Sequence, residues 1–236
     1  KSGASLHRMD AQEGLIKKMI PLAWVVTPNL MEASALTGVK VNSLEAMKKA
    51  AYRIHKMGAK HVVVKGGHLK GMAIDLLYDG KKFSEMGRLR IDTKNTHGTG
   101  CTFASAIATL LAKGDSVFEA VRKAKTFITL AIQSSLSLGK GTGPTNPSAY
   151  LLREMERYRV IQELKRALEL LKENNIGDLI PEVSSNLGYA LPHAEGSEDV
   201  AAFPGRIVRF KNTVATQSDP EFGASQHVAN IILTVM

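Results

Sequence analysis

The feature that most constrains the fold of this chain is a glycine-rich segment at residues 95–101, NTHGTGC, placed directly before a run of small apolar residues. The run over 102–112 predicts a helix, so the glycines would lie at its N-terminus. Backbone N–H groups are unpaired there and the helix dipole favours negative charge. We therefore expect the amides of Gly98, Thr99 and Gly100 to bind a phosphoryl group, with a simple turn as the alternative reading of a lone Gly-x-Gly.

The charge of the chain is uneven along its length. Of a net charge of +9, residues 1–150 carry +12 and residues 151–236 carry −3. A basic half can bind nucleic acid, but the lysines are scattered and no aromatic residues alternate with them, so we expect no nucleic-acid partner. Anionic small molecules, or solvated helix faces, account for the bias equally well.

Cysteine content and hydropathy indicate the compartment. Cys101 is the only thiol, which excludes an internal disulfide and fits a reducing cytoplasm. No apolar run approaches the ~20 residues needed to span a bilayer, so we expect no membrane partner. The 236 residues suffice for one large domain or two small ones with a real core.

Strand and helix patterns alternate in the first half. We expect a strand over 22–27, then a helix over 44–57 with an Asn42–Glu45 capping box and Gly58 at its end. A strand over 61–64 follows, and then a hairpin of 73–78 and 81–86 around an Asp79-Gly80 type I′ turn. The last two elements are the helix over 102–112, which ends at Gly114, and a helix from 115 to about 138. This alternation predicts a parallel α/β sheet with helices on both faces and a local antiparallel edge.

The pattern changes after residues 139–147, which are rich in Gly, Thr and Pro. An amphipathic helix is expected over 153–173, and we place a domain boundary within 150–158. The prediction is thus two domains, 1–150 and 155–236. The second has short segments separated by Pro and Gly, typical of a smaller α/β domain, and ends in an amphipathic helix from about Ala224.

Four stretches of the first half follow one another in a specific order: VVTPNLMEASALTG, VVVKGGHLKG, NTHGTGCTFASAIATLLAKG and GKGTGPTNP. Together they resemble the hydroxymethylpyrimidine-phosphate kinases of the ribokinase-like superfamily. The resemblance covers roughly residues 1–150 and lacks the family's front half. It implies the rear half of a ribokinase-like α/β/α sandwich with a parallel sheet, and ATP and Mg²⁺ as cofactors.

The resemblance also implies roles for single residues. Cys101 stands where related kinases carry an aspartate base, and a helix N-terminus favours its thiolate. Glu32 is the expected metal ligand, because Asn29 and Glu32 match the family's Asn-x-x-Glu segment, although this spacing is also an ordinary helix cap. Lys65 lies at the end of a buried strand, which is where ligands bind in open α/β sheets. Its alternative role is that of a solvated lysine at a strand end. The expected cofactor-binding residues are Asn29, Lys65, Gly66 and Thr96.

Three stretches of the second half also follow in order: LIPEVSSNLGYALPHA, DVAAFPGRIVRF and PEFGASQHVANIIL. They resemble the front of the archaeal-type thiamine-phosphate synthase domain, which is commonly fused behind this kinase. The implied reaction joins hydroxymethylpyrimidine pyrophosphate to thiazole phosphate and releases pyrophosphate. Such a site needs cations around the leaving oxygens and acceptors around the aminopyrimidine.

Polar residues at segment ends supply the candidates for this chemistry. The planar guanidinium of Arg206 matches phosphate oxygens, and His227 is a candidate partner of the same anion. The expected substrate-binding residues are Glu182, Asn186, Glu221 and Ser225. Ordinary alternatives stay open: Arg206 as a surface residue of a strand, His227 as a histidine of a capped helix, and residues 184–186 as a helix cap.

The sequence as a whole indicates a bifunctional thiamine-biosynthesis enzyme whose partners are small molecules: hydroxymethylpyrimidine and its phosphates, thiazole phosphate and ATP. We expect a cytoplasmic homo-oligomer. One alternative is that the second domain senses thiamine phosphates without turnover. Another is a kinase for pyridoxal or a sugar, of which Cys101 disfavours the sugar kinase.

Overall fold

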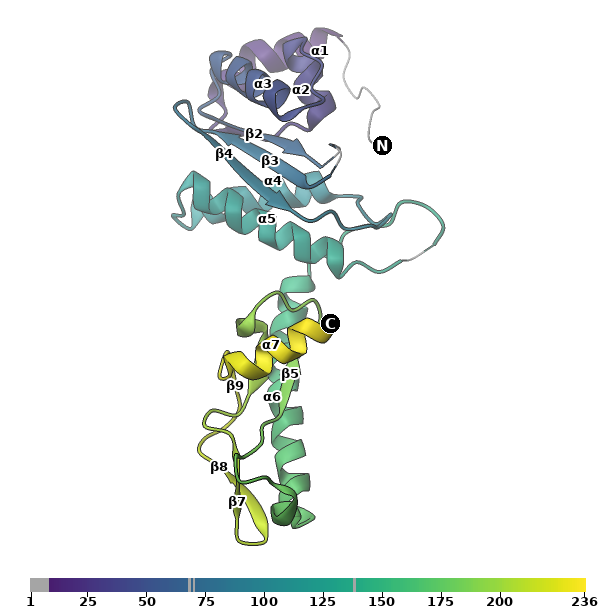
Figure 1. Ribbon diagram of the computed structural model, residues 1–236. Coiled ribbons are helices and arrows are strands. Elements are labelled where there is room, and N and C mark those ends of the chain that lie inside the picture. The colour runs from purple at the N-terminus through teal and green to yellow at the C-terminus, as the bar shows by residue number, and fades with distance from the viewer. Residues whose placement is uncertain (1–8, 68, 70, 138) are drawn as a thin grey trace. The chain divides into compact units, whose positions relative to one another are not determined.

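The chain forms two compact units, residues 1–147 and residues 148–236. The computed structural model describes residues 9–67, 69, 71–137 and 139–236 (Figure 1). The division between the units falls just before the range expected from the sequence, because the long helix of the second unit begins at Ala149 rather than at Arg153. No helix of the described residues is long and apolar enough to cross a membrane.

The first unit is built on a four-stranded sheet in the order β1-β2-β3-β4. Its strands are β1 (Val25–Val26), β2 (His61–Gly66), β3 (Ala73–Tyr78) and β4 (Phe83–Arg88). β1 and β2 are parallel, whereas β2, β3 and β4 pair antiparallel. The expected α/β class is confirmed, but the antiparallel part is larger than a local edge. Short loops join β2, β3 and β4, and short loops permit only antiparallel pairing, whereas the helical crossover after β1 permits the parallel pair.

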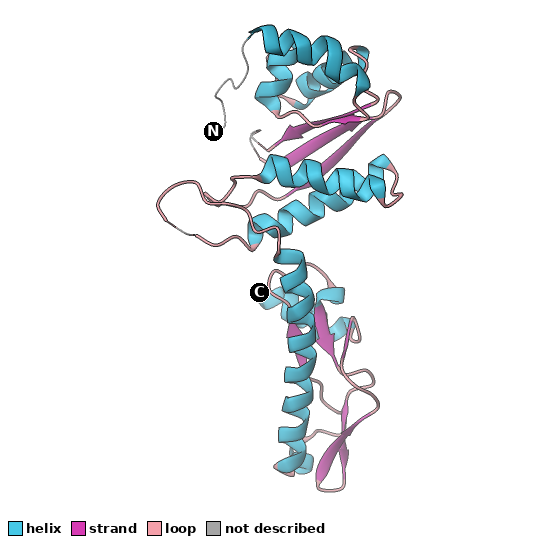
Figure 2. Cartoon of the chain, turned by 180° about the vertical axis from the view of Figure 1, so that it is seen from behind, coloured by secondary structure: helices cyan, strands magenta, loops and turns pink. Residues whose placement is uncertain are grey.

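Helices cover both faces of this sheet (Figure 2). α1 (Met9–Gly14) precedes β1 and is followed by a π-helical turn (Leu15–Met19) and a 3-10 turn (Ile20–Leu22). α2 (Leu30–Thr37) and α3 (Leu44–Lys56) lie between β1 and β2 in the chain. α4 (Thr99–Ala112) and α5 (Val117–Gln133) follow β4. Successive side chains of β2 point to opposite faces. Val62 and Val64 therefore pack with α2 and α3, and Val63 packs with α4 and α5. This arrangement confirms the sandwich of helices, sheet and helices.

Several helix ends differ from the expected ones. α4 begins at Thr99, three residues before the expected start at residue 102. α3 is capped by the hydroxyl of Ser43, which accepts a hydrogen bond from the amide of Ala46 at 3.2 Å, so the prediction that Asn42 caps it was wrong. Both residues suit a cap, and the backbone turns into the helix one residue later than expected. Gly58 follows the helix with φ +116, in the conformation that favours glycine. α5 ends at Gln133, short of the expected Leu138, which lies outside the described residues.

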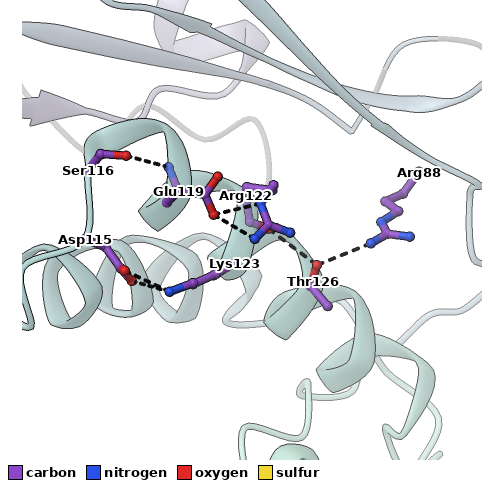
Figure 3. A network of polar contacts seen from close by, with 7 residues as sticks. All are labelled: Arg88, Asp115, Ser116, Glu119, Arg122, Lys123 and Thr126. Carbon is purple, nitrogen blue, oxygen red and sulfur yellow. Dashed lines mark hydrogen bonds and ion pairs between the residues drawn. The ribbon is translucent and has the colours of Figure 1, made fainter. Parts of the chain in front are cut away.

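The surface of α5 carries a network of polar contacts that Figure 3 shows. Its members are Arg88, Asp115, Ser116, Glu119, Arg122, Lys123 and Thr126. The hydrogen bond between Glu119 and Arg122 lowers the pKa of the carboxyl group and raises the pKa of the guanidinium. Exposed ion pairs of this kind contribute little to stability, so the network does not determine the fold.

The hairpin of β3 and β4 does not have the expected two-residue turn. Tyr78 pairs with Phe83, which leaves the four-residue loop 79–82. The Asp79 carboxylate accepts hydrogen bonds from the amides of Lys82 at 2.7 Å and Lys81 at 2.8 Å, and these bonds lower the pKa of Asp79. The side chain of Asp79 thus closes the turn itself, as aspartate commonly does.

The second unit packs short strands against one long helix, α6 (Ala149–Glu173). The strands are β5 (Gly188–Ala190), β6 (Val200–Ala202) and β9 (Glu221–Phe222) in a three-stranded antiparallel sheet, and β7 (Ile207–Phe210) and β8 (Thr213–Thr216) in a hairpin; 3-10 turns lie at Ile176–Leu179 and Ser197–Asp199. Val160, Leu164 and Leu168 recur every four residues on one face of α6 and are buried against Phe203 and Ile207. The last helix is α7 (Gln226–Val235), which starts two residues later than expected because Ser225 caps it.

Candidate functional site

The parallel pair of strands brings the first two motifs together. The amide of Lys65, in β2, donates a hydrogen bond to the carbonyl of Pro28 at 2.8 Å, and Asn29 and Lys65 form an isolated parallel bridge. Both segments lie at the carboxyl ends of their strands. In open α/β sheets this edge is where ligands bind.

The Lys65 side chain reaches the third motif at the start of α4. A Cβ atom added to Gly100 would lie 3.2 Å from the Lys65 Nζ atom. Within the described part of the chain, no carboxylate pairs with this ammonium group and no acceptor binds it. An unpaired cation beside the positive end of a helix is electrostatically unfavourable unless an anion lies between them.

The start of α4 has no side-chain cap, whereas Asn29, Ser43, Ser116 and Ser225 cap α2, α3, α5 and α7. Gly98 occupies the N-cap position with φ +84, and Thr99 donates to the Thr96 carbonyl only at 3.4 Å. The amides of Gly100 and Cys101 have no acceptor among the residues that the structure describes. This start therefore offers unpaired N–H groups to an anion.

The fourth motif packs against the same loop. The amide of His97 donates to the carbonyl of Gly143 at 3.0 Å, and the amide of Thr145 donates to the carbonyl of His97 at 3.1 Å. Gly143 must be a glycine, because the Asn95 side-chain oxygen occupies the place of a Cβ atom. The second and fourth motifs thus contact residues 95–100, and the first motif contacts the second through Lys65. His68 and Lys70 of the second motif lie outside the described residues.

Asn29 and Glu32 form a capping box at the start of α2, which was the alternative to a metal-binding role for this pair. The Asn29 side-chain oxygen accepts hydrogen bonds from the amides of Met31 and Glu32, each at 2.9 Å, and Glu32 Oε2 accepts one from the amide of Asn29 at 2.7 Å. The Asn29 oxygen is therefore satisfied by the backbone. Glu32 is exposed and keeps its second carboxylate oxygen, which fits Mg²⁺ held by one carboxylate together with phosphates and water. No group of three or more metal-ligating side chains occurs in the described chain.

Cys101 lies in the first turn of α4 and is exposed, with a free thiol. Its side chain starts one residue after Gly100, on the turn that the Lys65 ammonium approaches. Thr96 precedes this turn and is exposed, and its carbonyl accepts the hydroxyl hydrogen bond of Thr99 at 2.9 Å. Gly66 must be a glycine because a Cβ atom would overlap the carbonyl of Ile74.

Three charged residues that the sequence did not single out organise this edge of the sheet. Arg90 donates hydrogen bonds to the carbonyls of Gly67 at 2.5 Å, Gly71 at 3.2 Å and Leu69, so one guanidinium holds the loop after β2. Asp75 accepts a hydrogen bond from the amide of Gly66 at 3.0 Å and pairs with Lys125 at 2.6 Å. A carboxylate inside the apolar pattern AIDLLY was the signal for Asp75; nothing local marks Arg90.

In the second unit, Arg206 does not lie in a strand as expected but directly before β7, with φ +73. Its guanidinium is exposed and donates a hydrogen bond to the carbonyl of Val183 at 2.6 Å. Ser185 and Ile207 exchange backbone hydrogen bonds at 3.0 and 2.8 Å. These contacts bring the loop at 181–186 beside the loop at 203–206, so two of the three recognised stretches meet.

Asn186, expected to bind substrate, joins these loops; its binding of substrate stays a prediction. Its side-chain oxygen accepts hydrogen bonds from the amides of Leu187 at 2.8 Å and Phe203 at 3.1 Å, and its side-chain nitrogen donates to the carbonyl of Phe203 at 2.9 Å. Its alternative as part of a helix cap also fails, because no helix follows it. We therefore assign Asn186 to the fold.

The other candidates of the second unit are spread over exposed segments. Ser225 caps α7 by accepting a hydrogen bond from the amide of Val228 at 3.4 Å, and His227 is exposed in the first turn. Glu221 is exposed in β9, which pairs with β6, and Glu182 is exposed in the loop that contacts Arg206. Within the described chain, neither a hydrogen bond nor an ion pair joins Arg206 to His227.

The sheet of the first unit, with helices on both faces, is typical of a ribokinase-like kinase domain. Comparison with known proteins agrees. The family model for Phosphomethylpyrimidine kinase matches residues 1–146, and the model for Thiamine-phosphate synthase ThiN matches residues 163–236. The chain belongs to the phosphomethylpyrimidine kinase family.

Individual relatives give the extent of the similarity. The chain is 50% identical over 147 residues to the Thiamine biosynthesis bifunctional protein ThiED of Geobacter sulfurreducens. The matched residues make up 62% of this chain and 30% of that protein. It is 45% identical over 152 residues to the Hydroxymethylpyrimidine/phosphomethylpyrimidine kinase of Bacillus subtilis, 64% of this chain and 56% of the relative. The chain thus spans about half the length of the curated kinases it matches.

Solved structures of pyridoxal kinases share the fold. The ADP complex of the Bacillus subtilis enzyme has a TM-score of 0.60 at 44% identity, over 62% of this chain and 58% of that one. The Staphylococcus aureus enzyme with AMP-PCP and pyridoxal has a TM-score of 0.60 at 42% identity, over 62% of this chain and 56% of the other. Both neighbours were solved with an adenine nucleotide or its analogue.

Proposed function

We propose that this chain acts in thiamine biosynthesis and that its first unit phosphorylates hydroxymethylpyrimidine and its monophosphate from ATP. The observation that carries the proposal is the unpaired Lys65 ammonium beside the uncapped start of α4. Together they supply positive charge from two sides, as a nucleotide phosphate requires. The names of the curated relatives support the substrate, and the nucleotide complexes of the structural neighbours support ATP.

In the proposed step, an oxygen of the pyrimidine substrate attacks the γ-phosphorus of ATP. A new P–O bond forms, the bond from the γ-phosphorus to the bridging oxygen breaks, and ADP leaves. The amides at the start of α4, of which those of Gly100 and Cys101 have no acceptor in the described chain, and the Lys65 ammonium stabilise the charge on the transferring group. When the attacking oxygen is a hydroxyl, Cys101 is the candidate base for its proton, because its exposed side chain lies on the same helix turn.

Asn29, Gly66 and Thr96 shape the backbone around this site. Asn29 fixes the start of α2, Gly66 lets β2 end close to Ile74, and Thr96 orients the turn before α4. Bound Mg²⁺ would neutralise charge on the nucleotide phosphates. Glu32 would hold it through its free carboxylate oxygen.

We propose that the second unit couples hydroxymethylpyrimidine pyrophosphate to thiazole phosphate. The bond between the pyrimidine methylene carbon and the pyrophosphate oxygen breaks, pyrophosphate leaves with the electron pair, and the thiazole nitrogen forms the new C–N bond. Arg206 binds the leaving pyrophosphate, with His227, Ser225 and the start of α7 as further partners of an anion. Glu182 and Glu221 accept hydrogen bonds from the pyrimidine amine.

The kinase proposal is tested by incubating the chain with ATP, Mg²⁺ and either hydroxymethylpyrimidine, its monophosphate or pyridoxal. We expect ADP formation to be fastest with a pyrimidine substrate, to stop with a chelator, and to fall in Cys101→Ser. Faster turnover of pyridoxal would reassign the specificity. Equal turnover in Cys101→Ser would remove the thiol from the proposed role.

The synthase proposal has its own assay, because preformed hydroxymethylpyrimidine pyrophosphate bypasses the kinase. Thiamine phosphate is followed by its fluorescent oxidation product. We expect product from the wild-type chain, little from His227→Ala, and wild-type amounts from Gln226→Ala, the neighbouring exposed residue. Saturable binding of thiamine phosphate without any product would indicate a sensing domain instead.

The expected partners are small molecules, and a cytoplasmic homo-oligomer remains a prediction. Sedimentation of the chain at several concentrations would test the oligomer.

A further inference from the structure

The strand register places an acidic residue directly opposite Lys65. Lys65 of β2 pairs with Asp75 of β3 in the antiparallel ladder. Side chains of directly opposite residues lie on the same face of a sheet, with Cβ atoms about 4.5–5.5 Å apart, and opposite charges at such positions attract. An ion pair between Lys65 and Asp75 is therefore the arrangement expected from the register alone.

The structure shows a different pairing. Asp75 Oδ2 lies 2.6 Å from the Nζ atom of Lys125 in α5, and Lys125 also donates a hydrogen bond to the carbonyl of Ala73 at 3.1 Å. The second oxygen of Asp75 accepts the amide of Gly66 at 3.0 Å. Lys65 turns instead toward Gly100. Arg88, another cation on this side of the sheet, binds the hydroxyl of Thr126 at 3.2 Å.

Because the Asp75 carboxylate is buried, it matters which cation pairs with it. Asp75 is 6% exposed and Lys125 is 8% exposed, and a carboxylate that far from solvent requires a counter-charge. If Lys125 did not supply it, the flexible Lys65 side chain could reach the carboxylate opposite it. Lys65 would then be neutralised by the protein and lost to a phosphate ligand.

We propose that Lys125 is a positioning residue for the nucleotide site: by pairing with Asp75, it keeps this carboxylate from capturing Lys65. The inference rests on the proposed role of Lys65 in binding nucleotide phosphates. Lys125 would act without touching the nucleotide, and it lies in α5, outside the four kinase motifs. It also explains why a buried acid lies one strand away from a phosphate-binding lysine without cancelling its charge.

The test compares Lys125→Gln with the double variant Asp75→Asn/Lys125→Gln. Glutamine keeps a donor for the carbonyl of Ala73 and asparagine keeps an acceptor for the amide of Gly66, so the double variant retains neutral hydrogen bonds. We expect Lys125→Gln to bind ADP at least about tenfold more weakly than wild type, and the double variant to recover wild-type affinity within about twofold. Removing both charges also relieves the cost of an unpaired buried carboxylate, so recovery of affinity is read together with the reactivity of Lys65 in the ligand-free protein. Capture of Lys65 by Asp75 slows acylation of Lys65, whereas a loss of stability alone does not slow it.

Two outcomes overturn the proposal: wild-type ADP affinity in Lys125→Gln, or weak binding in a folded double variant. If Lys125→Gln does not fold, weak ADP binding by a folded double variant still contradicts the proposal. A wild-type chain that fails to bind ADP would instead contradict the proposed function. The inference then still has a ligand-free readout, the rate of Lys65 acylation followed by mass spectrometry. We expect acylation to slow in Lys125→Gln and to recover in the double variant, and equal rates in all three proteins would refute the proposal.

Discussion

The ammonium group of Lys65 lies against the first turn of α4, so close to Gly100 that a Cβ atom on this glycine would lie 3.2 Å from the Lys65 Nζ atom. The two residues come from separate motifs, one at the end of β2 and one after the β3–β4 hairpin. Their meeting places a mobile positive charge beside unpaired backbone amides. An anion placed between this ammonium group and the helix N-terminus would be attracted by both.

Gly100→Ala tests this geometry while leaving the fold intact. The new methyl group would displace the Lys65 ammonium by a few tenths of an ångström, so we expect ADP to bind several-fold more weakly. The free energy of unfolding should rise, since alanine favours a helix over glycine by about 0.5–1 kcal/mol. Calorimetric titration and thermal unfolding measure the two effects.

Gly14→Ala is the matched control, because Gly14 also lies in a helix and has open space around its Cα atom. It should gain similar stability and keep wild-type ADP affinity. Unchanged affinity in Gly100→Ala would show that Lys65 does not act at this helix start.

Arg206 offers a way to separate strain from function. Its φ of +73 costs an L-residue about 1–2 kcal/mol, and glycine avoids this cost. We expect Arg206→Gly to be more stable than Arg206→Ala by about 1 kcal/mol, and both variants to lose thiamine phosphate formation, because both lack the guanidinium. Thermal unfolding and the fluorescent product assay distinguish the two effects, and a glycine variant with normal turnover would take Arg206 out of the synthase site.

Asn186 should behave as a residue of the fold. Asn186→Ala removes two hydrogen bonds to Phe203 and one from the amide of Leu187, so we expect the second unit to lose about 2–3 kcal/mol of stability. Glu182→Ala, in the same loop but exposed, should change stability by less than about 0.5 kcal/mol. Calorimetry of both variants would refute the assignment if Asn186→Ala melted like the wild type.

Local patterns predicted the elements better than they predicted contacts between distant residues. Gly58 follows the end of α3 as expected, through short-range backbone chemistry, and the alternation of strands and helices predicted the α/β class. Choosing Asn42 over Ser43 failed because both residues suit a cap and only the packed helix decides between them.

The roles of the site residues depend on partners far along the chain. The hydrogen bonds of Asn186 to Phe203 and the pairing of Asp75 with Lys125 join segments 17 and 50 residues apart. Sequence spacing carries no information about such pairs. The four kinase motifs predicted the family, but not that Lys65 would reach Gly100 or that Arg90 would hold the loop after β2.

The central claim is that the first unit binds a nucleotide phosphate between Lys65 and the start of α4. Titration of ADP with Mg²⁺ into the wild type, Lys65→Met and Lys60→Met tests it most directly, because Lys60 is an exposed lysine just before the same strand. We predict that Lys65→Met binds ADP at least about tenfold more weakly at unchanged melting temperature, while Lys60→Met binds like the wild type. Equal ADP affinity in all three proteins would contradict the account.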